Sequence, residues 1–235
     1  MIIVAGGDSF IWGSELADSP HGGKYGYSRS TYPALLAKQA NIDYVCAAYP
    51  GNANQAISRM AINSCSKDPF LFVTWTYPQR AEFMFNDEWK SINSWHTTEK
   101  EFSKQYFNHT NSEYFELYST LKEILFLQQY CRLNHIPYLF MTADNHFYQT
   151  ENYHRRSNFE LKNLYTQIDW QSWFFFPAGN QANETQAPRG FYQWAIENKY
   201  SIGADGHPLE DAHRDAALLI KEKFNELVKK SIQSN

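Results

Sequence analysis

Short apolar runs that alternate with longer helical stretches are the feature of this sequence that most limits its fold. Each run is too short for a helix of its own, and such runs are typical of buried parallel strands. They cover Ile2–Ala5, Tyr44–Ala48, Phe70–Trp75, Tyr138–Thr142 and Trp173–Phe176. The helix-like stretches are Tyr32–Gln39, Asn54–Ser64, Glu113–Leu133 and Ala212–Ile232. The alternation predicts a flavodoxin-like three-layer α/β/α sandwich with a five-stranded, mostly parallel sheet.

Two aromatic-rich segments interrupt this alternation. Phe, Tyr and Trp make up 17% of the 235 residues, and many of them fall within residues 80–112 and 147–193. No hinge rich in Gly, Pro or Ser separates either segment from the rest, so we predict one domain over residues 1–235 with two insertions. Insertions in α/β folds lie over the carboxyl ends of the strands, where ligands bind. We therefore expect an aromatic cap there. It would include Trp89, Trp95 and Tyr153.

The charge balance and the cysteines exclude several classes of protein. The net charge is −4, and without basic runs it argues against nucleic acid or an anionic membrane as partner. No apolar run approaches the roughly 20 residues of a membrane span, and no signal peptide precedes the first strand-like run, so we expect a cytoplasmic protein. The three cysteines are widely spaced, which suits free thiols. They are Cys46, Cys65 and Cys131. No cluster has zinc spacing and no Gly-rich phosphate motif occurs, so we expect neither metal nor cofactor.

A candidate nucleophile follows the first apolar run directly, in Gly7-Asp8-Ser9. The residue just past the carboxyl end of a parallel strand faces the ligand crevice. Gly7 permits a tight turn, and Ser9 then begins the next helix, whose N-terminus favours an anionic oxygen. The alternative is a serine that only caps this helix, which is a common use of serine.

A candidate base lies near the other end of the chain, in Asp205-Gly206-His207-Pro208. A serine nucleophile needs a neutral imidazole as base, and that imidazole needs a carboxylate to orient it. Asp205 and His207 would supply both groups from one short loop before the last helix. Alternatively, the segment is an ordinary surface turn, with Glu210 and Asp211 as first-turn acids of the helix that follows.

Together these two blocks resemble the SGNH (GDSL-type) hydrolase family, and the resemblance spans nearly the whole chain. It implies Ser9 as the nucleophile, His207 as the general base and Asp205 as the residue that orients the base. It also implies that the backbone N–H of Gly51, after the second strand, binds the oxyanion together with the N–H of Ser9. Without the resemblance, Gly51 would be taken for part of a plain Pro-Gly turn.

The chain departs from the family after the third strand. The family usually has Gly-x-Asn-Asp there, and the Asn side chain donates to the oxyanion, whereas here Thr76 falls at its place. Losing one oxyanion donor typically costs about 2.7–4 kcal/mol of transition-state stabilisation. Thr76 is the first candidate substitute, and Asn52, Asn54 and Arg80 are the others. For Asn54, capping of the following helix is an alternative role.

Other polar residues are weaker candidates. Asp144-Asn145-His146 ends the Tyr138–Thr142 strand and could either bind substrate or form a solvated loop. His213 lies on the last helix and is expected at the surface or at the edge of the core, and His21 is expected in a loop.

These features predict a serine esterase or deacylase that cleaves a carboxylic ester, such as an O-acetyl group, through an acyl-enzyme. The substrate would be a small molecule or a glycan ester, and the oligomeric state stays open. The missing Asn motivates an alternative, a weakly active or inactive protein of the same fold that binds carbohydrate or lipid. Acyl transfer to an acceptor alcohol would use the same residues.

Overall fold

The central sheet has four parallel strands in the order β2-β1-β3-β6. The computed structural model describes residues 1–19, 26–94, 99–149, 159–178 and 188–233. The strands are β1 (Ile2–Gly7), β2 (Asp43–Ala48), β3 (Pro69–Trp75) and β6 (Tyr138–Thr142), each at a position where the sequence predicts one. The order agrees with the predicted flavodoxin-like arrangement.

The fifth predicted strand is reduced to a single contact. Trp173 forms one parallel bridge with Phe140 of β6, and Phe176 pairs in the antiparallel direction with Arg189. The apolar run Trp173–Phe176 therefore extends the sheet at one residue only. It is apolar because its side chains are packed into the interior, and burial by packing gives the same sequence pattern as burial within a sheet.

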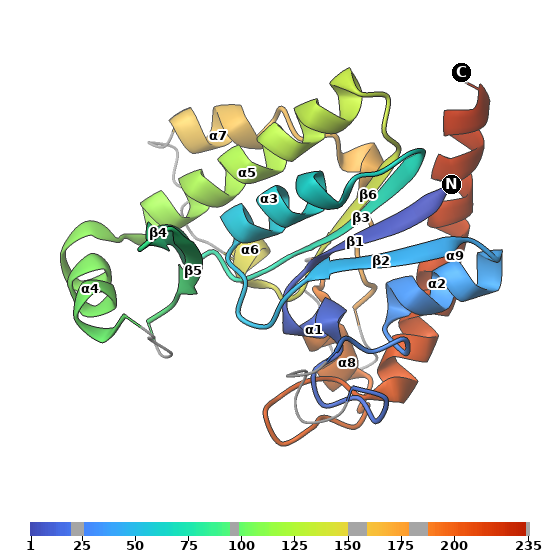
Figure 1. Ribbon diagram of the computed structural model, residues 1–235, viewed down its shortest axis with the longest axis horizontal. Coiled ribbons are helices and arrows are strands. Elements are labelled where there is room, and N and C mark those ends of the chain that lie inside the picture. The colour runs from blue at the N-terminus through green and yellow to red at the C-terminus, as the bar shows by residue number, and fades with distance from the viewer. Residues whose placement is uncertain (20–25, 95–98, 150–158, 179–187, 234–235) are drawn as a thin grey trace.

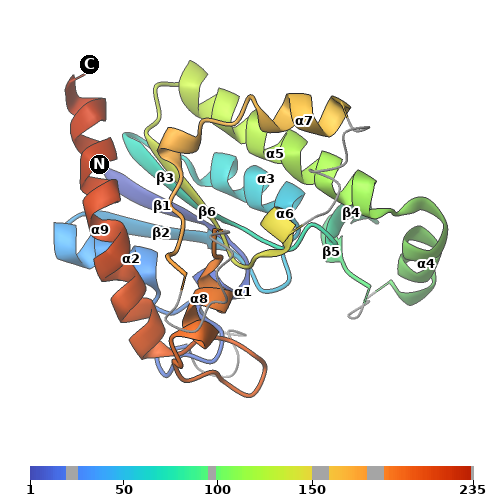
Figure 2. The same cartoon turned by 180° about the vertical axis from the view of Figure 1, so that it is seen from behind.

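Helices cover both faces of the sheet (Figures 1 and 2). On one face lie α3 (Asn54–Ser64), α5 (Glu113–Leu133) and α7 (Phe159–Tyr165); on the other lie α2 (Tyr32–Ala40) and α9 (Glu210–Gln233). Successive side chains of a strand point to opposite faces. In β1, Ile3 packs toward α2 and α9, whereas Val4 packs toward α3 and α5. Within the described residues, no helix combines the length and apolar character of a membrane span.

Local signals explain where these helices begin and end. Ser112 caps α5 by accepting a hydrogen bond from the N–H of Phe115 at 3.2 Å, as N-cap serines commonly do. Pro33 stands in the first turn of α2, and Asn41 ends that helix in the left-handed conformation. Short helical elements complete the description. They are α1 (Ser9–Trp12), α4 (Lys100–Gln105), α6 (His146–Gln149), α8 (Phe191–Glu197), a π-turn over Tyr106–Thr110 and a 3₁₀ turn over Trp170–Ser172.

The first aromatic-rich segment forms a hairpin that the sequence analysis did not predict. Strands β4 (Ala81–Phe85) and β5 (Glu88–Ile92) pair in the antiparallel direction, and Figure 1 shows them with α4 at the end of the molecule opposite the two termini. The hairpin is tied to the core because Ser91 Oγ accepts a hydrogen bond from the N–H of Ala53, just before α3, at 2.9 Å.

Most described aromatics of the second segment, with the exception of the exposed Phe159, pack into the core and do not form a cap. Trp173 is 3% exposed and packs against Phe140, Phe147 and Trp170 on the α5 side of the sheet. The predicted aromatic cap is therefore wrong for this part of the segment. Trp95 and Tyr153, which were expected in the cap, lie outside the described residues.

Candidate active site

Ser9 lies where the sequence predicts it, at the first position of α1 directly after β1. The turn between them requires glycine, because a Cβ on Gly7 would lie 2.3 Å from Cγ1 of Ile11. Asp8 caps the short helix, and its Oδ1 accepts a hydrogen bond from the N–H of Phe10 at 3.1 Å. Asp8 therefore takes the capping role, and Ser9 is not needed for it.

The carboxylate next to His207 comes from Glu15. The Nδ1 atom of His207 lies 2.7 Å from Oε2 of Glu15, and both side chains are only 16% exposed. The same carboxylate accepts hydrogen bonds from the backbone N–H groups of Asp205 at 2.9 Å and His207 at 3.2 Å. A Cβ on Gly203 would lie 2.5 Å from the Glu15 carboxylate, so glycine leaves the space into which this carboxylate fits.

The expectation that Asp205 orients His207 is therefore wrong. Asp205 is exposed, and it contributes its backbone N–H to Glu15 while its own carboxylate makes no hydrogen bond or ion pair with the described residues. Sequence reasoning missed Glu15 because it is separated from His207 by 192 positions. No local motif marks such a partner, whereas Asp205 stands two residues from His207 and matches the block that the resemblance implies.

Hydrogen bonding keeps Glu15 in its charged form. Partial burial by itself would raise the pKa of the Glu15 carboxyl, but the N–H of Asp205 and the side chain and N–H of His207 outweigh it and lower the pKa below its usual value. The His207 ring also packs edge-on against Phe10, with ring centroids 5.4 Å apart. Because Phe10 directly follows Ser9, the imidazole and the candidate nucleophile belong to the same edge of the sheet.

A buried ionic network occupies the place of the missing Asn. Thr76 Oγ1 donates to Oδ2 of Asp8 at 2.6 Å, and Arg80 Nη1 lies 2.9 Å from the same carboxylate oxygen. Arg80 Nη1 also donates to Thr76 Oγ1 at 2.9 Å and to the carbonyl of Asn52 at 3.1 Å. The single hydroxyl proton of Thr76 is thus directed to Asp8, so Thr76 does not offer it to an oxyanion in this arrangement.

Asn52 and Asn54 are turned into the structure. The Nδ2 of Asn52 donates to the carbonyl of Gly7 at 3.0 Å and contacts Sδ of Met60 at 3.4 Å. Asn54 is 2% exposed, accepts from the N–H of Thr76 at 2.9 Å and donates to the Thr76 carbonyl at 3.2 Å. Both side chains hold neighbouring loops in register.

Two backbone N–H groups at this edge of the sheet are candidates for binding an oxyanion. Within the described residues, the N–H groups of Ser9 and Gly51 donate to no protein acceptor. Gly51 has a φ of 81°, a left-handed conformation that favours glycine, and a Cβ added there would meet nothing within 4 Å. These two groups match the pair that the resemblance implies, and their role in catalysis belongs to the proposal below.

A second His–carboxylate pair stands at the end of β6. The Asp144 carboxylate, on a residue 2% exposed, accepts a hydrogen bond from Nδ1 of His146, whose side chain is half exposed and packs edge-on against Tyr77. This hydrogen bond raises the pKa of His146. Asn145 is also buried, and it accepts a hydrogen bond from the N–H of Gly190 at 2.7 Å. Residues 144–146 are therefore packed against the protein and do not form a solvated loop.

His213 is a core residue, and its expected position at the surface or core edge is wrong. It is 1% exposed, stacks on Tyr32 with ring centroids 5.4 Å apart, and its Nδ1 accepts the N–H of Tyr32 at 3.3 Å. Burial, together with a smaller effect of the nearby His207, lowers the pKa of His213 to about 3. His213 is therefore neutral and structural. His21 lies outside the described residues.

The described residues contain no group of three or more His, Cys, Asp or Glu side chains that could hold a metal ion. The three cysteines carry free thiols. At the carboxyl end of β1, the described residues offer a hydroxyl, an imidazole held by a carboxylate, and backbone N–H groups.

Comparison with known proteins gives a likeness in structure alone, since no protein-family model and no curated protein matches the sequence. The acetyl xylan esterase Est2A from Butyrivibrio proteoclasticus aligns with a TM-score of 0.51 and 12% identity, over 97% of this chain and 64% of that one. The psychrotrophic esterase EstA from Pseudoalteromonas sp. aligns with a TM-score of 0.47 and 13% identity, over 99% of this chain and 98% of that one. A G-D-S-L family protein from Desulfitobacterium hafniense gives a TM-score of 0.43 and 10% identity, over 94% and 98%. Identities this low carry the fold and not the activity: the chain shares the α/β fold of the acetyl xylan esterase, which agrees with the fold that the resemblance to the SGNH (GDSL-type) hydrolases implies.

Proposed function

We propose that this protein is a serine esterase that cleaves a carboxylic ester, such as an O-acetyl group, through an acyl-enzyme. The observation that carries the proposal is the His207 imidazole, held by Glu15 at 2.7 Å and packed on Phe10, the residue that follows Ser9. Nucleophile, base and orienting carboxylate are the three parts that this chemistry requires.

The two half-reactions use the same groups. Ser9 Oγ attacks the ester carbonyl carbon while its proton passes to Nε2 of His207, the ring nitrogen that does not face Glu15. The tetrahedral intermediate then collapses, the bond to the alcohol oxygen breaks, and the alcohol leaves with the proton from His207. A water molecule, deprotonated by His207, attacks the acyl-Ser9 ester. The bond between the acyl carbon and Ser9 Oγ then breaks, the acid leaves, and His207 returns the proton to Ser9 Oγ.

The oxyanion of each intermediate would be bound by the N–H groups of Ser9 and Gly51. Thr76 and Arg80 take a supporting part, because they hold Asp8 and the carbonyl of Asn52 and thereby fix the loops on either side of Ser9. One donor fewer than in the family pattern implies a turnover lower by the 10²- to 10³-fold that such a donor is typically worth.

A fluorophosphonate probe, which reacts with activated serines, tests the proposal. We expect the wild-type protein to be labelled and Ser9→Ala to be unlabelled, with p-nitrophenyl acetate hydrolysis lost in the same variant. Ser14→Ala is a matched control, since Ser14 is also a buried serine near α1 but has no place in the mechanism. A folded wild-type protein that is neither labelled nor active would contradict the proposal.

A further inference from the structure

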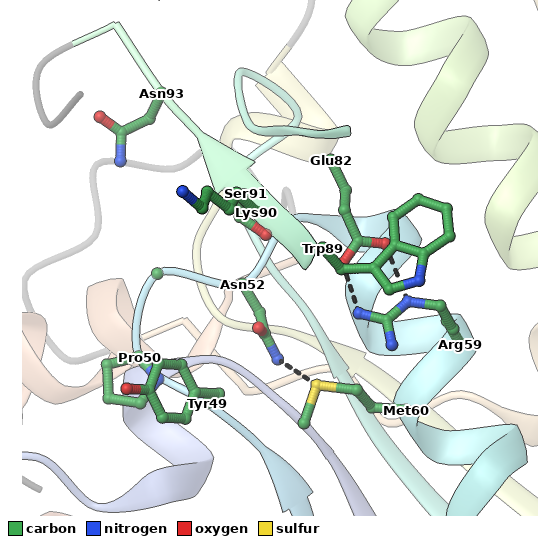
Figure 3. A pocket seen from close by; sticks show the side chains of 11 residues that line it. Tyr49, Pro50, Asn52, Arg59, Met60, Glu82, Trp89, Lys90, Ser91 and Asn93 are labelled. Atoms are coloured by element: carbon green, nitrogen blue, oxygen red, sulfur yellow. Dashed lines mark hydrogen bonds and ion pairs between the residues drawn. The ribbon is translucent and has the colours of Figure 1, made fainter. Parts of the chain in front are cut away.

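A cavity of about 760 Å³ lies beside the candidate oxyanion site, between the loop that follows β2 and the β4–β5 hairpin (Figure 3). Ligand pockets for small molecules typically measure about 300–1,000 Å³. Tyr49 and Gly51 line it on the loop side, and Trp89 lines it on the hairpin side. The cavity is therefore large enough for a ligand and belongs to the segment that interrupts the bare α/β alternation.

Two residues that line the cavity also belong to the proposed reaction centre or contact it. Gly51, whose N–H is a proposed oxyanion donor, lines it, and so does Asn52, which donates to the carbonyl of Gly7 two positions before Ser9. On the opposite side, Ser91 of β5 accepts from the N–H of Ala53 at 2.9 Å. A group bound in the cavity would thus lie next to an ester whose carbonyl oxygen occupies the oxyanion site.

Two aromatic rings are offered to a ligand in this cavity. Trp89 is 48% exposed and Tyr49 is 55% exposed, whereas most aromatic side chains of the core are almost fully buried. Each ring also contacts a neighbouring side chain, which limits its movement. The Arg59 guanidinium covers Trp89 with its carbon 4.9 Å from the ring centroid, and Trp12 meets Tyr49 edge-on at 5.3 Å.

The charged side chains around the cavity are paired with one another. Arg59 forms two hydrogen bonds with the Glu82 carboxylate, at 2.6 and 3.1 Å, and Lys90 lies 2.9 Å from Glu99. The side chains that could bind a charged ligand are therefore already engaged in ion pairs. A plain acyl chain would cover the Arg59 guanidinium and the Lys90 ammonium, whose side chains are 31% and 32% exposed, without replacing their contact with water, and burying charged groups in this way is costly.

We propose that the cavity binds a neutral saccharide, the alcohol part of an O-acylated carbohydrate whose ester is cleaved at Ser9. The rings of Trp89 and Tyr49 would face the apolar faces of the sugar, while the partly exposed side chains of Arg59 and Lys90 would donate hydrogen bonds to its hydroxyl groups. The assignment of the ester to Ser9 rests on the proposed function, whereas the binding of the saccharide does not.

Calorimetric titration with unesterified sugars tests the binding separately from catalysis. Xylotetraose, cellotetraose and N-acetylchitotetraose are titrated into the wild-type protein, Ser9→Ala, Trp89→Ala and Phe159→Ala. Phe159 is an equally suitable aromatic for truncation, because it is 79% exposed and does not line the cavity. We expect at least one sugar to bind the wild type, Ser9→Ala and Phe159→Ala alike, and Trp89→Ala to weaken its binding roughly tenfold, or about 1.4 kcal/mol. No binding by any of the sugars at millimolar concentration, or equal binding by Trp89→Ala and Phe159→Ala, overturns the proposal.

Kinetics then connects the cavity to the ester. With an acetylated form of the bound sugar and with p-nitrophenyl acetate as substrates, Trp89→Ala should lower kcat/KM for the first more than for the second, by roughly tenfold. If Trp89→Ala instead changes the preference among p-nitrophenyl esters of increasing acyl length, the cavity holds the acyl chain and the proposal is wrong. Sugar binding by a protein that no fluorophosphonate labels would contradict the proposed esterase and leave the saccharide site in place.

Discussion

Glu15 is held by three N–H donors from one short loop, and this arrangement fixes the proton on His207. Because Nδ1 of His207 faces a carboxylate that stays charged, Nδ1 carries the hydrogen and Nε2 is left as the basic nitrogen. Glu15 itself has a positive φ of 68°, a conformation uncommon outside glycine. The backbone is thus in a slightly unfavourable conformation at the residue whose carboxylate contacts the candidate base.

Substitution of Glu15 by Gln should separate the observed partner of His207 from the one that the motif suggests. Glu15→Gln keeps the size of the side chain but removes the charge that stabilises a protonated His207, so we expect kcat for p-nitrophenyl acetate to fall by roughly 10²- to 10⁴-fold. Asp205→Asn is the matched control and should stay within about twofold of wild type, since its carboxylate is exposed. Loss of activity in Asp205→Asn, with Glu15→Gln active, would return the orienting role to Asp205.

The Asp8–Arg80 pair should contribute strongly to stability when only one partner is removed. Asp8 is fully buried, and the Arg80 side chain is 9% exposed. Arg80→Ala leaves a buried carboxylate without its cation, which typically costs about 3–5 kcal/mol, and urea unfolding measures this loss. Asp8→Asn combined with Arg80→Ala removes both charges and should be less destabilised than Arg80→Ala alone. A double variant that is as unstable as the sum of the two single variants would show that the charges do not interact.

At the scale of elements, helices and strands could be predicted wherever the pattern of apolar residues and the capping residues lie within a few positions of one another in the sequence. The hairpin β4–β5 was missed although the sequence carries its signal. The apolar run Phe83–Phe85 leads directly into Asn86-Asp87, a turn-forming pair whose φ values of 48° and 64° are those of a two-residue hairpin turn. The fifth strand was overpredicted for the opposite reason, because a run of buried aromatics does not show whether its backbone pairs with a sheet.

The packing of α9 on α2 should make stability depend on pH through His213. Its Nδ1 accepts the first N–H of α2, a group that has no partner within the helix. The pKa of His213 is about 3 in the folded protein against 6.5 for an unperturbed histidine. Between these values the unfolded chain binds a proton that the folded protein excludes, so this part of the stability is complete above pH 6.5 and falls as the pH drops toward 3.

Urea unfolding of the wild type and His213→Gln at pH 6.5 and pH 5 measures this effect, because glutamine retains a hydrogen-bond acceptor and does not titrate. The wild type should lose up to about 2 kcal/mol more than the variant over this interval, at 1.36 kcal/mol for each pH unit. Equal losses in the two proteins would mean that His213 is protonated in the folded state.

At the scale of the whole molecule, the contacts that the sequence could not reveal are those that join its two ends. The blocks around Ser9 and His207 were located from local patterns, and the fold brings both to the same edge of the sheet. The carboxylate beside His207 depends on how the loop after α1 meets the loop before α9, across 192 positions of sequence. The aromatic residues show the same limit, since composition located two rich segments but not which of them faces solvent.

The two aromatic segments should therefore respond differently to the same substitution. Trp173, 3% exposed among Phe140, Phe147 and Trp170, belongs to the core, and Trp173→Ala should lower the free energy of unfolding by about 3–5 kcal/mol because it opens a cavity. Trp89, 48% exposed on the hairpin, should cost about 1 kcal/mol or less when replaced by Ala. Urea unfolding of both variants, followed by far-UV circular dichroism to avoid the change in tryptophan signal, gives the comparison. Equal costs would mean that the hairpin is as much a part of the core as the Trp173 segment, and that Trp89 is needed to hold the fold before it can serve a ligand.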